Sequence, residues 1–201
     1  NLEVSIDYSE EKIQLQLQLF NTELNNAISR EFARIEGTDS LEYDGEMMRI
    51  QINKNISSAS IKGISFNSNY HFNTLLSVNA NCNYIVGLTY ENRPLAHIPP
   101  LNAKIEINYT VTKHSISLYS HYSAAKKAIK YDDGGVDNLE EATIDGAPMW
   151  YTLNVAYKKT IDQNLSFSCG IKNIMDIHYK SFGSGISASG RNFIVSLHAN
   201  L

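Results

Sequence analysis

Apolar and polar residues alternate along most of this chain with a period of two. The last stretch shows the pattern clearly, since every second residue is apolar: Phe193, Val195, Leu197, Ala199 and Leu201. Such a period places the apolar and polar side chains on opposite faces of a β-strand. We therefore predict a strand of about ten residues that runs to the last residue, a length with which a tilted strand crosses a bilayer.

The same alternation predicts about eight further strands. They lie near residues 2–8, 13–19, 47–72, 76–84, 103–109, 116–122, 151–157 and 165–171. Gly63 interrupts the third of these and indicates a bulge or a close approach of another backbone segment. Short turns separate some strands, and four long polar loops separate others, at residues 28–45, 87–101, 124–148 and 174–190. Because sequential strands reverse direction, the turns should gather at one end of a sheet and the loops at the other.

This rhythm predicts an all-β fold, an antiparallel meander of about nine long strands. Outer-membrane barrels have short turns at the periplasmic end and long loops at the extracellular end. Several tyrosines fall toward the ends of the apolar faces, as in an interfacial girdle: Tyr8, Tyr84, Tyr109, Tyr122, Tyr151 and Tyr157. A soluble β-sandwich has the same alternation with its apolar face in a core, so the pattern alone leaves both architectures open. Strands near ten residues, longer than the usual five or six, favour the barrel.

Composition narrows the functional classes. The 201 residues carry a formal charge of −4 and no basic run, so nothing favours nucleic acid as a partner. No stretch approaches the ~18 consecutive apolar residues of a transmembrane helix. Cys82 and Cys169 lie inside predicted strands, where small buried or lipid-facing thiols are expected in preference to metal ligands. With no phosphate loop, zinc-ligand spacing or nucleophile motif, we predict no catalytic residue, metal or cofactor, and hence no enzyme.

Some residues are nevertheless candidates for binding a ligand: Tyr131, Asp132, Asp133, Trp150, Asn79, Asn81 and Asn83. The three asparagines share one face of a strand, which suits a wet lumen better than a dry core. The acidic loop at 131–145 suits a cation or a cationic ligand, or is simply a solvated loop. Trp150 either stacks on a ligand at the base of this loop or anchors its strand at the membrane interface.

Four segments resemble recurring elements of the TonB-dependent outer-membrane receptors. They read GRNF at 190–193, IKNIMD at 171–176 with Tyr179 after it, LAHIPPLNAKIEIN at 95–108, and ASIKGI at 59–64. Ser65 departs from the family pattern, which has an acidic residue there, and Leu201 stands where the family usually ends in an aromatic residue. Asp176 and Arg191 flank the last loop and are expected to pair in a structural role.

The resemblance implies the carboxyl-terminal part of a transmembrane barrel of about 22 strands. A plug domain and the segment that contacts the TonB complex would then precede Asn1, and the chain would be a fragment located in the cell outer membrane. The implied function is uptake of a scarce ligand, such as a ferric siderophore, a cobalamin or an oligosaccharide, with energy transmitted by TonB. A small passive pore and a secreted β-sandwich with a binding or adhesion role remain as alternatives.

Overall fold

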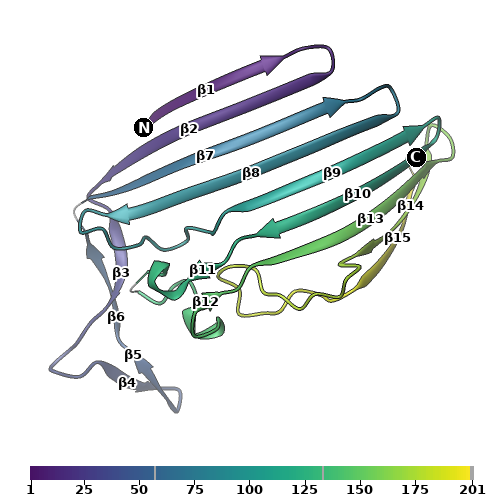
Figure 1. Ribbon diagram of the computed structural model, residues 1–201. Coiled ribbons are helices and arrows are strands. Elements are labelled where there is room, and N and C mark those ends of the chain that lie inside the picture. Colours follow the sequence, from purple (N-terminus) through teal and green to yellow (C-terminus); the bar gives the residue numbers. More distant parts are fainter. Residues whose placement is uncertain (57, 133, 200–201) are drawn as a thin grey trace.

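A nine-stranded antiparallel sheet makes up most of the molecule (Figure 1). The computed structural model describes residues 1–56, 58–132 and 134–199. In sheet order the strands are β1 (Leu2–Ser9), β2 (Ile13–Asn25), β7 (Ser58–His71), β8 (Leu76–Thr89), β9 (Asn102–Val111), β10 (His114–Ser123), β13 (Trp150–Thr160), β14 (Leu165–Lys172) and β15 (Asn192–Ala199). The predicted meander of about nine long strands is therefore confirmed. No helix in the described ranges is long and apolar enough to cross a membrane.

The two ends of the sheet differ, as the sequence predicts. Short turns lie together at one end, at residues 10–12, 72–75, 112–113 and 161–164. Long connections lie at the opposite end, at residues 26–57, 90–101, 124–149 and 173–191 (Figure 1). Asn73 and Asp162 close two of the turns, because each side-chain oxygen accepts hydrogen bonds of 2.8 and 2.9 Å from two backbone N–H groups.

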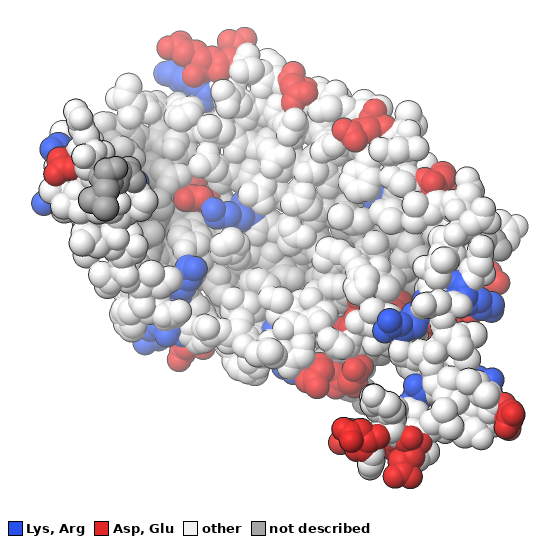
Figure 2. All heavy atoms as spheres, turned by 180° about the vertical axis from the view of Figure 1, so that it is seen from behind, with Lys and Arg blue, Asp and Glu red and all other residues white. Residues whose placement is uncertain are grey.

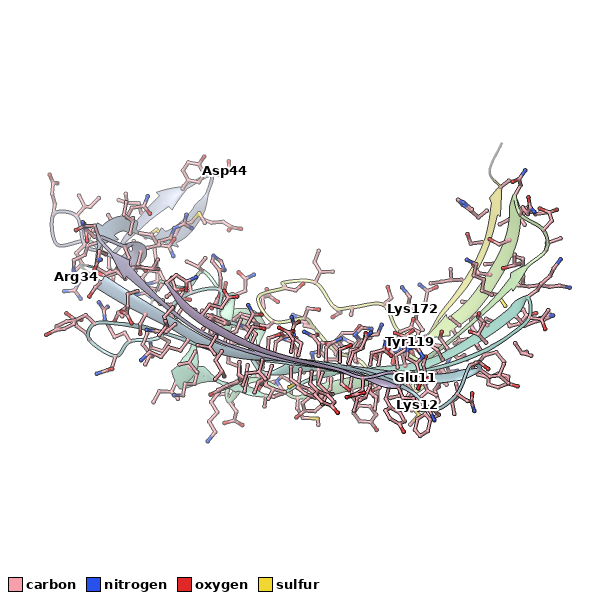
Figure 3. The ribbon with its side chains drawn as sticks, turned by 90° about the horizontal axis from the view of Figure 1, so that it is seen from above. Glu11, Lys12, Arg34, Asp44, Tyr119 and Lys172 are labelled. Carbon is pink, nitrogen blue, oxygen red and sulfur yellow. The ribbon has the colours of Figure 1, made fainter. Side chains whose placement is uncertain are left out.

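The register of the sheet aligns apolar residues into rows on one face. Ile107 pairs with both Val78 and Leu118, and Leu118 also pairs with Val155. The sheet is strongly curved, and Tyr119, the neighbour of Leu118, lies on its concave side (Figure 3). Because side chains alternate along a strand, the apolar rows lie on the convex face and the polar rows on the concave face.

The convex apolar face is exposed. Leu118 and Ile107 are 47% and 41% exposed, although both lie near the middle of the sheet. In the ranges that the structure describes, only Ile50, Ala59 and Tyr131 are buried apolar residues. A soluble β-sandwich would bury its apolar rows between two sheets, so the sandwich interpretation does not fit this architecture.

The segment 26–57 differs from its prediction as a polar loop followed by a single strand. It forms an arm of two short hairpin ladders, which pair β3 (Ile28–Phe32) with β6 (Gln51–Asn55) and β4 (Ser40–Tyr43) with β5 (Glu46–Arg49). Asp44 and Gly45 make the outer turn, with φ angles of 53° and 82°. Asp-Gly is a strong hairpin signal because both central residues of this turn need positive φ. The strand predicted over 47–72 is therefore three strands, since β7 begins at Ser58.

Gly63 does not lie at a bulge, and the group that approaches it most closely is a side chain. The register of β7 continues unbroken through Gly63, which pairs with Phe20 on one side and Ile85 on the other. The ring of Phe20 occupies the space that a Cβ atom at position 63 would need. The aromatic ring thus covers a glycine on the neighbouring strand.

The other two-stranded ladder lies in the connection at 124–149. It pairs β11 (Lys126–Lys127) with β12 (Gly146–Ala147), and the two 3₁₀ turns η1 (Ala128–Lys130) and η2 (Leu139–Glu141) lie between them. At the carboxyl end, β15 is observed to Ala199. The predicted continuation of this strand to Leu201 falls outside the described residues.

Candidate functional site

The three candidate asparagines belong to β8, and their side chains lie on the concave face of the sheet. Asn79 pairs with Glu106 on β9, and Asn81 pairs with Lys104. Asn83 belongs to a chain of side-chain hydrogen bonds, because it accepts one from Ser65 at 2.7 Å and donates one to Asn102 at 3.3 Å. Asn83 is thus held by its neighbours. The role of the three asparagines toward a ligand stays a prediction.

Charged groups on the concave face are few. Figure 2 shows this face, where most atoms belong to uncharged residues. Lys104 Nζ donates a 2.6 Å hydrogen bond to Glu106 Oε2, which neutralises both groups, and lies 5.3 Å from the centre of the Tyr119 ring. Lys172 on β14 also points to the concave side (Figure 3). The face is therefore polar, with slight excess positive charge around β9 to β14.

A cavity of about 370 Å³ opens on the concave face near its loop end. Its lining combines polar residues of the sheet with aromatic residues, and includes Asn81, Lys104, His121, Trp150 and Phe182. We call these five residues the concave-face site. A mixture of aromatic surface and a few placed polar groups is typical of small-molecule sites.

Trp150 is part of the concave-face site, and this position argues against its interpretation as an anchor at the membrane interface. Trp150 pairs with Ser123, which pairs with Asn102, so all three lie in the same concave row. Its indole stacks on the ring of Tyr179 at 4.1 Å between centroids, with 30° between the planes. Trp150 therefore does not anchor the strand to lipid. It links the start of β13 to the last loop at the rim of the concave side.

Tyr131 is buried, with 5% of its surface exposed, and its role toward a ligand stays a prediction. Its ring meets Phe182 edge-on at 5.5 Å, and Lys126 Nζ lies 4.0 Å from the centre of the Phe182 ring and 5.0 Å from that of Tyr131. Lys126 also donates a 2.6 Å hydrogen bond to the carbonyl of Ile98. Three loops at residues 90–101, 124–149 and 173–191 thus meet around one lysine, and we call them together the loop cap.

Asp137 completes the loop cap. Its Oδ1 accepts a 2.9 Å hydrogen bond from the backbone N–H of His97, and its Oδ2 lies 3.7 Å from Lys126 Nζ. Burial lowers the pKa of Lys126, and the charge of Asp137 opposes this effect. Burial raises the pKa of Tyr131, and the charge of Asp137 adds to that shift. The solvated-loop interpretation is therefore wrong for Asp137, which is 2% exposed.

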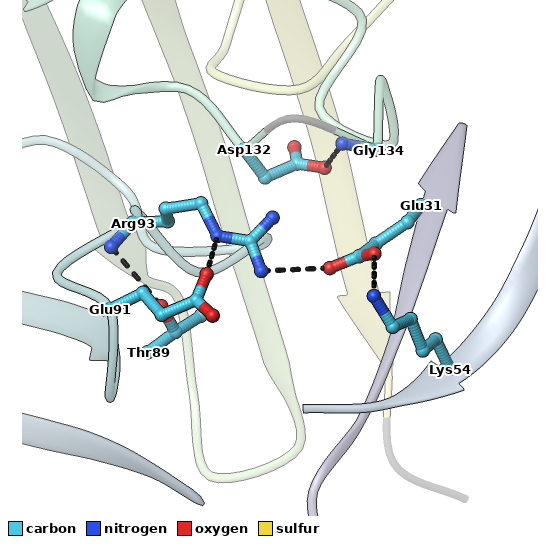
Figure 4. Close-up of polar contacts among 7 residues, drawn as sticks. All are labelled: Glu31, Lys54, Thr89, Glu91, Arg93, Asp132 and Gly134. Atoms are coloured by element: carbon cyan, nitrogen blue, oxygen red, sulfur yellow. Dashed lines mark hydrogen bonds and ion pairs between the residues drawn. The ribbon is translucent and has the colours of Figure 1, made fainter. Parts of the chain in front are cut away.

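Asp132 shapes the tip of the loop at 124–149. Its Oδ2 accepts a 2.8 Å hydrogen bond from the backbone N–H of Gly134, and Oδ1 is buried without a hydrogen-bond partner among the described residues (Figure 4). The neighbouring candidate Asp133 lies outside the described residues. Asp132 thus has a local structural role, and its role toward a ligand stays a prediction.

An ionic network beside this tip ties the arm to the loop at 90–101. Glu31 of β3 accepts a 2.9 Å bond from the Arg93 guanidinium and a 3.2 Å bond from Lys54, and Arg93 Nε lies 3.0 Å from Glu91 (Figure 4). Burial alone would raise the pKa of Glu31, but the hydrogen bonds and charges of Arg93 and Lys54 outweigh burial and lower that pKa.

A second cavity of about 210 Å³ lies between the loops at 131–148 and 178–184. Tyr131, His178 and Phe182 contribute to its lining. Glu141 and Lys180 close one side with a 2.7 Å ion pair, and this hydrogen bond lowers the pKa of Glu141. The residues that line this cavity are also those that hold the loop cap together. We therefore assign the cavity a secondary role in binding.

The last loop is held by Asn173, which belongs to the IKNIMD segment. Asn173 is 3% exposed, and its side chain bonds the backbone of Ile177 in both directions, at 2.8 and 2.9 Å. The expected pair of Asp176 and Arg191 takes a different form. Asp176 accepts from the backbone N–H of Arg191 at 2.7 Å, whereas the guanidinium donates to the carbonyl of Ile174 at 2.9 Å.

The chemistry available in the described residues is that of binding. In residues 1–56, 58–132 and 134–199 no group of three or more His, Cys, Asp or Glu side chains is placed to hold a metal ion. Cys82 and Cys169 are free thiols on convex rows.

A protein-family model matches most of the chain. The model is described as TonB dependent receptor-like, beta-barrel, and it covers residues 1–174. Both the fold class and the resemblance seen in the sequence are thereby confirmed. The family is one of receptors, in agreement with the prediction that the chain is not an enzyme. No curated protein matches the chain significantly.

Solved structures similar to this chain include transporters and receptors. The copper transporter OprC superposes with a TM-score of 0.78 at 17% identity, covering 98% of this chain and 30% of its own. A mutant of the ferric enterobactin receptor PfeA from Pseudomonas aeruginosa, in complex with enterobactin, superposes with a TM-score of 0.75 at 19% identity, with the same coverage of both chains. The siderophore receptor PirA from Acinetobacter baumannii superposes with a TM-score of 0.71 at 14% identity, covering 98% of this chain and 31% of its own. At such identities the likeness shows the fold, and this chain spans about 30% of their length.

Proposed function

We propose a transport function from one premise: the chain belongs to the TonB-dependent receptor-like β-barrel family. The whole protein takes up a scarce ligand, too large for porins, across the outer membrane. Energy for uptake is transmitted by TonB. The chain supplies a carboxyl-terminal part of the barrel wall, and the plug and the TonB-contacting segment precede Asn1.

The observation that carries this proposal is the division of the curved sheet into two faces. The convex rows are apolar and exposed, as in the row of Val78, Ile107 and Leu118, and suit contact with lipid. The concave rows are polar and nearly uncharged, and suit a wet lumen. With the turn end on the periplasmic side, the loop cap and the arm lie at the extracellular surface.

The concave-face site lies where an incoming ligand would pass from the loops into the lumen. Trp150 and Phe182 offer aromatic surface, while Asn81 and His121 offer hydrogen-bonding groups. Lys104 adds a charge that Glu106 already balances, so the site has no strong preference for the sign of a ligand. The residues bind and guide a ligand, and no bond is made or broken.

Among the three ligand classes considered, ferric siderophores should be tested first. The similar structures PfeA and PirA are a ferric enterobactin receptor and a siderophore receptor, respectively. Cobalamins and oligosaccharides follow as the remaining classes.

The experiment that tests this function is uptake in the source organism with and without the intact gene. Cells receive iron-labelled siderophores, labelled cobalamin or labelled oligosaccharides under conditions that induce the gene. We expect one class to lose uptake on deletion of the gene, to regain it on complementation, and to lose it also when TonB is removed. Unchanged uptake of all three classes, or uptake that persists without TonB, would contradict the proposal.

A further inference from the structure

A lysine interrupts the apolar convex face near the loop end of the sheet. Lys62 of β7 pairs with Val86 of β8, two positions from the pair of Ile64 and Tyr84. Because side chains alternate along a strand, Lys62 shares the convex face with these apolar residues. Lys62 is exposed. A lysine that faces lipid is costly at the middle of a bilayer and is tolerated near its surfaces, so the depth of Lys62 matters.

The depth of Lys62 follows from the length of the strands. A tilted strand crosses the hydrocarbon core of a bilayer in about 9–11 residues. Counted from Leu76 at the turn end of β8, such a crossing ends between Tyr84 and Val86. Tyr84 is 48% exposed, and tyrosine is enriched at the surfaces of membranes. Lys62, the partner of Val86, therefore lies level with the lipid head groups on the loop side of the membrane.

Two neighbouring hollows of the convex face meet at Tyr84 and Val86. One, of about 310 Å³, lies between the end of β8 and the loops at 90–101 and 124–149, and its lining includes Leu101 and Ala124. The backbone N–H of Ala124 donates a 2.8 Å hydrogen bond to the carbonyl of Leu101, which continues the register of β9 and β10 and places both side chains on the convex face. The other hollow, of about 470 Å³, is shallow and lies over β2, β7 and β8. We call the two hollows together the outer-wall groove.

The outer-wall groove is basic. Lys127 and Lys130 line its first hollow, and Lys62 lines the second. Lys127 directly precedes η1 and Lys130 ends it, so a spacing of three residues brings both to the same side of this 3₁₀ turn. Within residues 1–56, 58–132 and 134–199 none of these three lysines forms an ion pair, and no Asp or Glu lines either hollow. Lys126 also lines the first hollow, but Asp137 balances its charge.

Asn21 adds a polar group to the second hollow. It pairs with Lys62 and lines the same space. Its Oδ1 atom is buried and has no hydrogen-bond partner among the residues that the structure describes. Because a buried polar atom without a partner is costly, this position suits a donor on a bound molecule, such as a sugar hydroxyl. The groove therefore combines an apolar floor, three cationic groups and a free acceptor.

We propose that the outer-wall groove binds a phosphorylated glycolipid of the outer leaflet. The ammonium groups of the three lysines donate hydrogen bonds to phosphate oxygens, as is usual for lysine at phosphate sites. A sugar hydroxyl bonds Asn21, and an acyl chain lies along Tyr84 and Val86. Basic pockets level with the head groups are a recurring form of lipid recognition. This inference rests on the proposed placement of the chain in the outer membrane with the loop end outward.

The test is lipid binding by the full-length receptor, purified in a neutral detergent and freed of native lipid. Native mass spectrometry measures the affinity for diphosphoryl lipid A, a phosphorylated and acylated disaccharide, and for the same lipid without its phosphates. We expect the phosphorylated form to bind at least about tenfold more tightly. Phosphatidylglycerol is the comparison for an anionic lipid without a sugar, and inorganic phosphate is the comparison for a soluble anion. Both should bind at least about tenfold more weakly than lipid A.

Two variants locate the lipid. The first combines Lys62→Gln, Lys127→Gln and Lys130→Gln, and should bind lipid A at least about tenfold more weakly than the unchanged receptor. The second, Val86→Trp, fills the groove without changing its charge and should also weaken binding. The matched control replaces three exposed lysines at the turn end by glutamine, Lys12, Lys158 and Lys159, and should keep the affinity within about twofold.

Heat-modifiable migration in gels checks that each variant still folds as a barrel. The proposal would be overturned by equal binding of lipid A with and without phosphates, by equal binding of phosphatidylglycerol or inorganic phosphate, or by a folded lysine variant that binds like the control. Lipid binding is measured without transport. A failure of uptake in cells would therefore refute only the proposed function, and a failure of lipid binding would leave that function standing.

Discussion

Lys126 and Asp137 form an ion pair in a place that solvent hardly reaches. Nζ of Lys126 and Oδ2 of Asp137 are 3.7 Å apart, and the two side chains are 6% and 1% exposed. The pair joins the two halves of the loop at 124–149, while Ile98 and His97 bring in the preceding loop. The loop cap is therefore a packed structure with its own charged centre.

Loss of the carboxylate should open the loop cap. Asp137→Asn leaves the Lys126 ammonium buried without its counter-charge, which costs about 3–5 kcal/mol for a buried pair. We expect faster trypsin cleavage after Lys127 and Lys130 in the folded receptor. Asp145→Asn removes an exposed carboxylate from the same loop and serves as the control. Equal cleavage rates in the two variants would show that the pair does not hold the cap.

The attachment of the arm should weaken in acid. The pKa of Glu31 is lowered in the folded protein, so its contribution to stability is complete above the unfolded value of about 4.3 and is lost as the pH falls through the lowered folded pKa. Spin labels at Met47 and Tyr90, in a cysteine-free receptor, report the distance between arm and loop. We expect a narrow distribution at neutral pH that broadens below about pH 4.

Glu31→Gln is the control for this titration. The neutral amide cannot form an ion pair with Arg93 or Lys54. The distance distribution between the two spin labels should therefore be broad already at neutral pH and should change little in acid. A wild-type distribution that stays narrow down to about pH 3 would contradict the assigned role of Glu31.

Gly134 fits against the arm because it lacks a side chain. A Cβ atom at this position would collide with the backbone carbonyl oxygen of Arg30. Gly134→Ala should break the hydrogen bond from Gln51. It should make the free energy of contact between loop and arm less favourable by about 1–3 kcal/mol. Faster hydrogen exchange in β3 and β6 measures this loss. Gly185→Ala, where the nearest side-chain atom is 3.9 Å away, should leave exchange unchanged.

How much the sequence predicts depends on whether a residue's partner is close along the chain. The period of two is a local property, and it locates all nine strands of the main sheet. The arm is mostly missed because its ladders are only four or five residues long, although Asp44-Gly45 is a readable turn signal. The short alternation at β4 is hidden among charges that suggest solvent.

The loop cap could not be predicted for a different reason. Lys126 and Asp137 look like the other charges of their loop, and only the fold shows that their partners include Ile98 and Phe182 from distant segments. Trp150 was ambiguous because its face depends on the register of β13. Asn173 could be singled out only through the family resemblance of its segment, since asparagine is common in ordinary turns.

A larger, charged residue at Asn81 should impair uptake without harming the fold. Asn81 lines the cavity of about 370 Å³ beside Lys104, and its face is wet, so Asn81→Arg should change the free energy of unfolding by less than about 0.5 kcal/mol. The arginine side chain would fill part of this cavity and should lower ligand uptake about tenfold or more. Asn81→Ser is the matched control and should transport normally. Normal uptake by the arginine variant would show that the ligand does not pass through the concave-face site.

The most direct test of the central claim compares the two faces at one point of the sheet. Leu118 and Tyr119 are neighbours on β10 and point to the convex and concave sides, respectively. In the full-length receptor, with Cys82 and Cys169 replaced by serine and the protein reconstituted in bilayers, a nitroxide is placed at either position. Its collisions with oxygen, which dissolves in lipid, and with a water-soluble nickel chelate are then measured. Our account predicts an oxygen-to-nickel collision ratio about tenfold higher at Leu118 than at Tyr119, because apolar oxygen concentrates in hydrocarbon; equal ratios or the reverse order would contradict it.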